Sequence, residues 1–238
     1  MCGRYTLTSQ EGLVEELQLA IAAPADSPDA AAWWRPRWNI APTQPAPIVP
    51  NREGPRHLEL ARWGLVPPWA ESLKGAARLI NARSETAATS RAFRDALARR
   101  RCLVPADGFF EWTHGGTAKL PFWIHPEPRR PVAFAGIWER WRSPPRVTRS
   151  GGAAPDSASP AVWVISFSIL TTAANALVAP LHDRMPVVLP HDAYDRWLDP
   201  ASIDPRAWGD LLAPAPLAGW TTTEVTPKIN RPDFDEPF

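Results

Sequence analysis

Val132-Ala133-Phe134-Ala135-Gly136-Ile137 is the apolar stretch that decides the fold class of this chain. Pro131 comes directly before it, and short apolar runs bounded by Pro and Gly predict strands. Three further runs have the same character, and they are Leu120–His125, Ala161–Leu170 and Met185–Leu189. The spacing of these runs predicts a protein built mainly on β-structure.

Short helices are expected around this β-structure. Thr8–Glu11 has the pattern of a capping box, which opens a helix. Ser90–Arg100 has apolar residues at helical spacing, and further short helices are expected after Pro190 and Ser202. We therefore predict an α+β fold, with a strongly bent, barrel-like mixed β-sheet and a few peripheral short helices.

Length and composition indicate one domain. The 238 residues include 29 Pro and 13 Gly. Their combined share of the chain is below the roughly 25–30% Pro and Gly that is typical of low-complexity disorder. Hydrophobic residues make up 45% of the chain, enough for a real core. A single domain is predicted over residues 2–238, with surface loops at 21–36 and 143–160, where Pro, Ala, Gly and Ser gather.

Several functional classes lack support in the sequence. The net charge of +1 excludes a strongly basic coat, so a nucleic-acid site would need local clusters of Arg. With two cysteines and no CxxC or HxxxH, no metal site is expected, and the absence of GxGxxG and P-loop patterns leaves no expected cofactor. No run of 18 apolar residues occurs, so we expect no membrane association and a cytoplasmic location.

Cys2 is the most reactive feature of the chain. Once Met1 is removed, this residue carries a free α-amine and a thiol on adjacent carbons, and both titrate near pH 8. With an aldehyde, the amine gives an imine and the thiol then closes a five-membered thiazolidine. With an amide carbonyl, the thiol attacks while the amine acts as its base. Both chemistries remain open from the residues of this segment alone.

Polar residues inside three turn-bounded apolar segments predict the rest of an active site. Asn81 opens the segment Asn-Ala-Arg-Ser-Glu-Thr, and His182 precedes an apolar run. Glu111 stands between Phe110 and Trp112, and an apolar environment of this kind suits a carboxyl group to proton transfer. Together with Cys2, these residues form a plausible catalytic set.

Seven segments in the same order resemble the signatures of the SRAP family, the SOS-response-associated peptidase domain proteins that shield abasic sites in DNA. A weaker echo follows at Val225–Asn230. The seven segments are Met1–Thr8, Trp38–Gln44, Arg62–Ala70, Asn81–Thr86, Arg101–Trp112, Phe134–Trp141 and His182–Leu189.

The resemblance implies that Cys2 is a nucleophile and that its target is the open-chain aldehyde of an abasic deoxyribose. The product is a thiazolidine crosslink formed through a Schiff base. By the same resemblance, Asn81 orients Cys2 or the sugar, Glu111 shuttles protons, and His182 acts as acid or base during sugar opening and dehydration. The family is also linked to autoproteolytic removal of Met1, and removal by a cellular aminopeptidase is the alternative for this chain.

Arginines near these segments are the expected phosphate contacts, since DNA binding requires neutralised phosphates. Arg4 and Arg83 lie beside the catalytic segments and are the first candidates, followed by Arg62 and Arg184.

An apolar wedge is expected at the segment 63–69, where Trp63, Pro67 and Trp69 could stack on a base. The expected partner is single-stranded or junction DNA with abasic sites, bound by a monomer that is nucleoid-associated when on DNA.

Two rival functions remain. N-terminal-nucleophile amidotransferases also begin Met-Cys-Gly, but the glutamine-binding segments of that group are missing from this chain. The second rival is a non-catalytic single-strand-binding module in which Cys2 is incidental. Lyase activity from the Schiff base is a corollary of the main hypothesis, and proteolysis of other proteins ranks below it. Cys102 is expected to be a buried, inert thiol.

Overall fold

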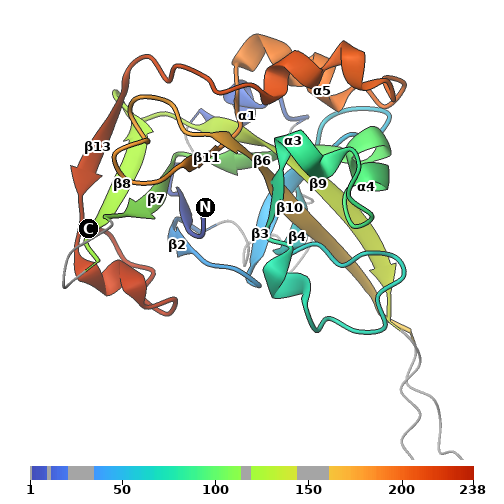
Figure 1. The fold of residues 1–238 in the computed structure, drawn as a ribbon, viewed down its shortest axis with the longest axis horizontal. Helices are drawn as coiled ribbons and strands as arrows, with labels where there is room; N and C mark the ends of the chain where they lie inside the picture. The colour runs from blue at the N-terminus through green and yellow to red at the C-terminus, as the bar shows by residue number, and fades with distance from the viewer. Residues whose placement is uncertain (1, 10–11, 21–34, 114–118, 144–160) are drawn as a thin grey trace, which may run out of the picture.

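A computed structural model describes residues 2–9, 12–20, 35–113, 119–143 and 161–238, and Figure 1 shows its two sheets with short helices around them. The strands are β1 (Tyr5–Leu7), β2 (Arg37–Ile40), β3 (Pro45–Pro50), β4 (Glu59–Trp63), β5 (Asn81–Arg83), β6 (Arg101–Ala106), β7 (Gly108–Trp112), β8 (Pro121–Pro126), β9 (Val132–Arg142), β10 (Trp163–Ala173), β11 (Arg184–Pro186), β12 (Val188–Leu189) and β13 (Trp220–Glu224).

Five strands of the larger sheet close into a barrel. β10 pairs with β4, β4 with β3, β3 with β6, β6 with β9, and β9 again with β10. The pairing of β10 with β4 is parallel and the other four are antiparallel, so the barrel is mixed. This closure confirms the predicted α+β class with a barrel-like mixed sheet.

The second sheet, in the order β13-β8-β7-β1-β2, is antiparallel throughout and holds the start of the chain. β1 is hydrogen-bonded on both sides, with Tyr5 opposite Ile40 of β2 and Phe109 of β7. Figure 1 shows this N-terminal strand (dark blue) near the centre of the view, between β2 and β7. Cys2, three residues before β1, is therefore held inside the molecule rather than at its periphery.

A shared core joins the barrel to the second sheet. Tyr5 of β1 packs edge-on against Trp63 of β4, with ring centroids 5.1 Å apart, and also meets Phe134 of β9. Trp63 stacks on Phe167 of β10. Cys102 is completely buried next to Gly136, as expected for an inert thiol.

Most of the predicted elements are found. The four apolar runs form β8, β9, β10 and the pair β11 and β12. The helices lie at the periphery (Figure 1), and they are α1 (Leu13–Glu16), α3 (Ser84–Ala87), α4 (Arg94–Arg99), α5 (Tyr194–Leu198) and the 3₁₀ turns η1 (Ala76–Arg78), η2 (His191–Ala193), η3 (Pro205–Ala207), η4 (Gly209–Leu212) and η5 (Pro227–Asn230). The helix predicted over Ser90–Arg100 corresponds to α4, and those expected after Pro190 and Ser202 also occur.

The capping-box prediction was wrong. α1 begins at Leu13 behind Gly12, which has φ of 76° and provides no side-chain cap. Thr8 instead donates its hydroxyl and its backbone N–H to Asp107 Oδ2, both at 2.6 Å. A buried carboxylate thus takes the hydroxyl that the sequence pattern assigns to the helix.

Two other expectations concern the ends and loops of the chain. Of the predicted surface loops, residues 21–34 and 144–160 lie outside the described residues. The single domain over 2–238 stays a prediction. Within the described part, no helix is both long and apolar enough to cross a membrane.

Gly108 allows a close approach that a larger residue would block. A Cβ at this position would lie 2.2 Å from Nε1 of Trp123 and 2.9 Å from the carbonyl oxygen of Ile124. That indole is fixed in place, since Nε1 donates to the Thr6 hydroxyl at 3.1 Å. The absence of a side chain at Gly108 therefore lets the Trp123 indole approach β7 closely while it donates to Thr6 of β1.

Gly108→Ala is expected to lower the free energy of unfolding by about 1–3 kcal/mol, because overpacking forces Trp123 or the backbone to shift. Urea denaturation measures this. Gly209→Ala is the control, since a Cβ there would have nothing within 4 Å. Equal stability of the two variants would contradict the steric account.

Candidate active site

Cys2 lies three residues before β1 and has no exposed surface. Its Sγ donates to the carbonyl oxygen of Arg4 at 3.6 Å. Burial raises the pKa of the Cys2 thiol well above its usual range, and the nearby carboxylate of Glu111 raises it further. The thiol is therefore protonated at neutral pH and needs a base before it can act as a strong nucleophile.

Asn81 holds the backbone of Cys2. It opens β5, which pairs in parallel with β10, so that Asn81 lies opposite Ile169. Its Nδ2 donates to the Cys2 carbonyl oxygen at 2.8 Å. Among the described residues, its buried Oδ1 has no hydrogen-bond partner. This amide oxygen is an acceptor that a substrate hydroxyl or the Cys2 amine can use.

Glu111, the next predicted catalytic residue, is buried. It belongs to β7, opposite Phe122 of β8, and is 2% exposed. Its effect on the Cys2 thiol places the carboxylate within electrostatic reach of Sγ. Three of the four predicted catalytic residues are thus brought together by β1, β5 and β7.

His182 lies in the turn between β10 and β11. When the ring is neutral, Nδ1 accepts the backbone N–H of Arg184 at 3.0 Å. When the ring is protonated, the same nitrogen can pair with the carboxylate of Asp183 at 2.7 Å. The strand after this turn pairs with the end of β10 that also carries β5, since Thr171 registers with both Arg83 and Pro186.

The four predicted phosphate contacts differ in their environments. Arg83 is exposed, and within the described part of the chain its guanidinium makes no hydrogen bond or ion pair. Arg184 is engaged by Glu85 through two hydrogen bonds of 2.6 and 2.9 Å, which hold the pKa of that carboxyl below its usual value. Arg62 donates to the carbonyl oxygen of Thr43 at 2.7 Å.

Arg4 is half-buried and serves the fold. Its guanidinium donates to the carbonyl oxygen of Ile229 at 2.8 Å and to Asn39 Oδ1 at 3.1 Å. Burial lowers its pKa from the usual value. Arg83 is thus the cation that the structure leaves most accessible among the four.

The predicted wedge needs correction at two of its three residues. Trp63 has no exposed surface and donates Nε1 to the Ile80 carbonyl oxygen at 2.9 Å, so it is a core residue. Pro67 is also buried. Trp69 is 53% exposed, and the Arg91 guanidinium lies 4.6 Å from its ring centroid. Only this third residue offers a face to a base.

The sequence alone suggested no role for the C-terminal segment, although it lies against the site. Trp112, next to Glu111, donates Nε1 to Asn230 Oδ1 at 2.7 Å. The one signal was the weak family echo at Val225–Asn230. Among the described residues, no group of three or more His, Cys, Asp or Glu could hold a metal ion.

Comparison with known proteins identifies the family of this chain. The family model described as SOS response associated peptidase (SRAP) matches residues 1–232. The chain belongs to the SRAP family. This SRAP chain is 32% identical over 239 residues to the abasic site processing protein YoqW of Bacillus subtilis (strain 168), covering 100% of the chain and 97% of the relative.

More distant relatives include the abasic site processing proteins YedK of Escherichia coli (strain K12) and HMCES of Gallus gallus. YedK is 32% identical over 204 residues, which cover 83% of this SRAP chain and 79% of YedK. HMCES is 31% identical over 213 residues, which cover 76% of the chain and 59% of HMCES.

Solved structures share the fold. A protein from Bacteroides thetaiotaomicron superposes with a TM-score of 0.78 at 23% identity, covering 95% of this SRAP chain and 93% of that structure. A protein from Bordetella bronchiseptica superposes with a TM-score of 0.70 at 27% identity, covering 94% and 100%.

Alkylation of Cys2 measures its burial directly. Because the pKa of the thiol is raised, the rate of labelling by iodoacetamide in the native protein is expected to keep rising above pH 9, where an ordinary thiol near pKa 8.5 levels off. Mass spectrometry of the N-terminal peptide checks this, with the urea-unfolded protein as control. A plateau near pH 8.5 in the native protein would contradict the burial.

Proposed function

We propose that this protein processes abasic sites by linking Cys2 covalently to the aldehyde of the open-chain sugar. The observation that carries the proposal is the position of Cys2. It is the second residue of the chain, and its carbonyl is held by Asn81 while Glu111 lies close enough to influence its thiol. Relatives named abasic site processing proteins match over most or all of the chain.

The reaction uses both nucleophiles of the N-terminal residue. The Cys2 amine adds to C1′ of the sugar, and the hydroxyl of the carbinolamine leaves as water to give an imine. Sγ then bonds to C1′, the electron pair of the C=N bond returns to nitrogen, and nitrogen receives the proton that the thiol loses. The net change is one thiazolidine ring formed and one water released.

Ring closure has to be faster than the competing loss of the 3′-phosphate from the imine. Both nucleophiles belong to one residue, so closure is intramolecular, and effective molarities for such steps reach about 10⁵ M or more. Glu111 is placed to take the proton from a thiol whose pKa burial has raised. The proposed outcome is a stable adduct that protects the DNA from cleavage.

Asn81 and His182 are assigned supporting roles. The Oδ1 of Asn81, which has no partner among the described residues, can accept a hydrogen bond from the amine or a sugar hydroxyl. His182 can exist in a neutral and a protonated form with a local partner for each. It is therefore suited to exchange protons with the sugar ring oxygen and the carbinolamine.

Removal of Met1 is a precondition, since the Cys2 nitrogen is a peptide nitrogen before it. We propose that Met1 is removed either by the site itself or by a cellular aminopeptidase. The protonated thiol next to Glu111 has the components for self-cleavage, and intact mass after synthesis without aminopeptidase distinguishes the two routes.

The proposed partner is single-stranded or junction DNA bound by a monomer, in the cytoplasm and on the nucleoid. An abasic position lacks a base to unpair, so an exposed lesion in a single strand is accommodated at little cost. Arg83 and Trp69 are the accessible phosphate and stacking candidates. The other three candidates already make hydrogen bonds within the protein, so their charge can attract phosphates only while those bonds are kept. They are Arg4, Arg62 and Arg184.

The decisive experiment is incubation with a single-stranded oligonucleotide that carries one abasic site, followed by a denaturing gel. The wild-type protein is expected to give a heat-stable band, and Cys2→Ala is expected to give none. Cys2→Ser is the matched control: like Cys2→Ala it keeps the α-amine and loses the thiol, but its hydroxyl preserves the shape of the side chain. It is expected to nick the strand through the imine without a stable adduct.

Two outcomes favour the rivals. Absence of a band from protein with Met1 verifiably removed, together with glutamine hydrolysis, would support the N-terminal-nucleophile amidohydrolase. Unchanged binding and processing in Cys2→Ala would support a non-catalytic single-strand-binding module. The thiazolidine proposal fails in either case.

Arg83→Ala is expected to weaken binding of single-stranded DNA similarly for all sequences, and to reduce the slope of log K against log salt by about 1. Fluorescence anisotropy at several salt concentrations measures this. Arg206→Ala is the control, because that side chain is 91% exposed and pairs with Asp204 in η3. Equal slopes for wild type and Arg83→Ala would exclude Arg83 as a phosphate contact.

A further inference from the structure

Cys2 has a second contact besides that with Asn81. The carbonyl oxygen of Arg4 accepts the backbone N–H of Phe110 at 3.0 Å and the thiol of Cys2 at 3.6 Å. The guanidinium of the same residue donates to the carbonyl oxygens of Ile229 and Asn230, at 2.8 and 3.4 Å. The position of Cys2 is therefore coupled to residues more than 220 positions away in sequence.

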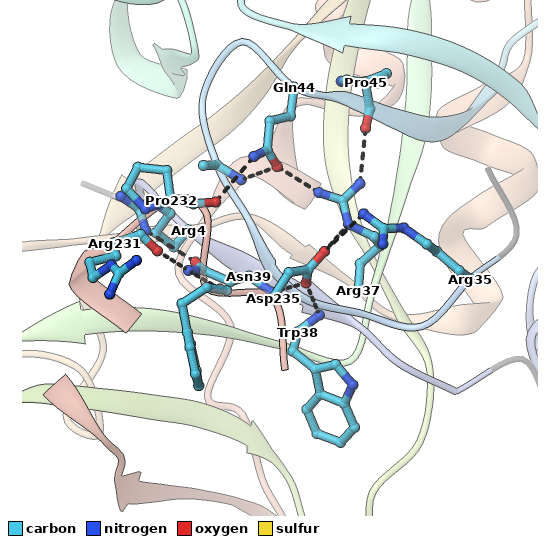
Figure 2. Close-up of polar contacts among 12 residues, drawn as sticks. Arg4, Arg35, Arg37, Trp38, Asn39, Gln44, Pro45, Arg231, Pro232 and Asp235 are labelled. Carbon is cyan, nitrogen blue, oxygen red and sulfur yellow. Dashed lines mark hydrogen bonds and ion pairs between the residues drawn. The ribbon is translucent and has the colours of Figure 1, made fainter. Parts of the chain in front are cut away.

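We call residues 227–235 the C-terminal clasp. The side-chain amide of Asn39, on β2, contacts this segment. Asn39 has no exposed surface, and its Nδ2 donates to three carbonyl oxygens of the clasp. These oxygens belong to Ile229, Arg231 and Phe234, at 3.2, 3.0 and 2.8 Å. Figure 2 shows the Asn39 amide between Arg4 and the clasp. Asn39 therefore links Arg4, the residue before β1, to β2 and to the clasp.

Asp235 closes the clasp with a carboxylate that is 15% exposed. Its Oδ1 accepts the backbone N–H groups of Trp38 and Asn39 at 2.6 and 2.9 Å, and its Oδ2 accepts Nε of Arg37 at 2.6 Å. Figure 2 shows these donors converging on the carboxylate, with Arg35 at 3.5 Å. Every donor requires an acceptor, so an amide in place of the carboxylate would turn an NH₂ group toward an N–H.

The clasp also contacts Trp112, the residue after Glu111. The indole of Trp112 donates to Asn230 Oδ1 at 2.7 Å, and Trp112 is the next residue after Glu111 on β7. The clasp thus contacts Arg4, two residues after Cys2, and Trp112, the residue directly after Glu111.

We propose that the C-terminal clasp positions Cys2 and Glu111 relative to each other, and that Asp235 is a positioning residue for the crosslinking reaction. The inference rests on the proposed function for its reaction. After Met1 is lost, Cys2 and Gly3 form a short free end before β1, and glycine adds freedom to it. The contacts of Asn81 and Arg4 with Cys2 limit this freedom, and the clasp holds Arg4 in place.

The test compares Asp235→Asn with Asp233→Asn. Both remove one negative charge from the same segment, but Asp233 and its partner Arg231 are 69% and 71% exposed. Single-turnover crosslinking to abasic single-stranded DNA gives an amplitude, which reports the folded fraction, and a rate constant, which reports the geometry. For Asp235→Asn we expect the saturating rate constant to fall about tenfold or more, because small misplacements of reacting groups are costly.

Binding separates positioning from recognition. Affinity for a strand with a tetrahydrofuran residue, which lacks the aldehyde, is expected to stay within about twofold of wild type for both variants, since no reacting atom is involved. A rate constant for Asp235→Asn equal to that of Asp233→Asn would overturn the proposal. A loss of amplitude or of affinity with an unchanged rate constant would also overturn it, because it would show a purely structural role.

A milder variant covers the case in which Asp235→Asn fails to fold. Trp112→Phe keeps an aromatic ring and removes the indole N–H that donates to Asn230. Its rate constant is expected to fall with the amplitude preserved, and an unchanged rate constant would overturn the proposal.

Hydrogen exchange of the peptide that covers residues 2–9 adds a readout that does not depend on DNA. Faster exchange is expected in Asp235→Asn, or in Trp112→Phe if the first variant does not fold, and not in Asp233→Asn. If wild-type protein forms no crosslink while this exchange difference is present, the proposed function fails and the anchoring stands. If wild type crosslinks and the exchange is unchanged, the anchoring fails and the proposed function stands.

Discussion

The pairing of β1 on both edges is the constraint on which the site depends. Chain ends normally fray, and a nucleophile at the second residue would move freely with them. Here Tyr5 is hydrogen-bonded between Ile40 and Phe109, and its ring packs on Trp63 inside the barrel. The three-residue strand is short, but it is central in its sheet and buried throughout. Through β1, the barrel therefore restrains Cys2, which would otherwise be mobile near the end of the chain.

Closure of the barrel explains why residues distant in sequence meet at Cys2. β10 borders β9 and β4, and its far end carries β5 and β11. Asn81 therefore arrives on a strand attached to the barrel, and Glu111 arrives on the strand directly after β6. Each group comes from a regular element instead of a long loop, which limits how far it can move when a substrate enters. The C-terminal clasp adds contacts from the last residues of the chain to those of the first.

The apolar runs from Leu120 onward predicted their strands because their side chains are buried and uninterrupted. The N-terminal half gave a weaker signal. β3 contains Pro45, Pro47 and Pro50 and yet lies inside the barrel, although Pro is normally confined to edge strands. The four catalytic candidates came from the chemistry of Cys2, from polar residues in turn-bounded apolar segments and from the family resemblance. Trp63 and Pro67 are buried and Trp69 is exposed, a difference that no local sequence pattern indicates. The clasp could not be foreseen, since Asn39 and Asp235 are ordinary polar residues whose meeting depends on the complete fold.

The burial of Cys2 affects how readily its thiol is oxidised. Peroxide attacks the thiolate and not the thiol, and it needs access to sulfur. A sulfur with no exposed surface and a raised pKa meets neither condition. The same environment that makes the thiol dependent on a neighbouring base thus keeps it in the reduced state between encounters. The proposed nucleophile is therefore expected to resist conversion to sulfenic acid in a cell whose oxidant level has risen.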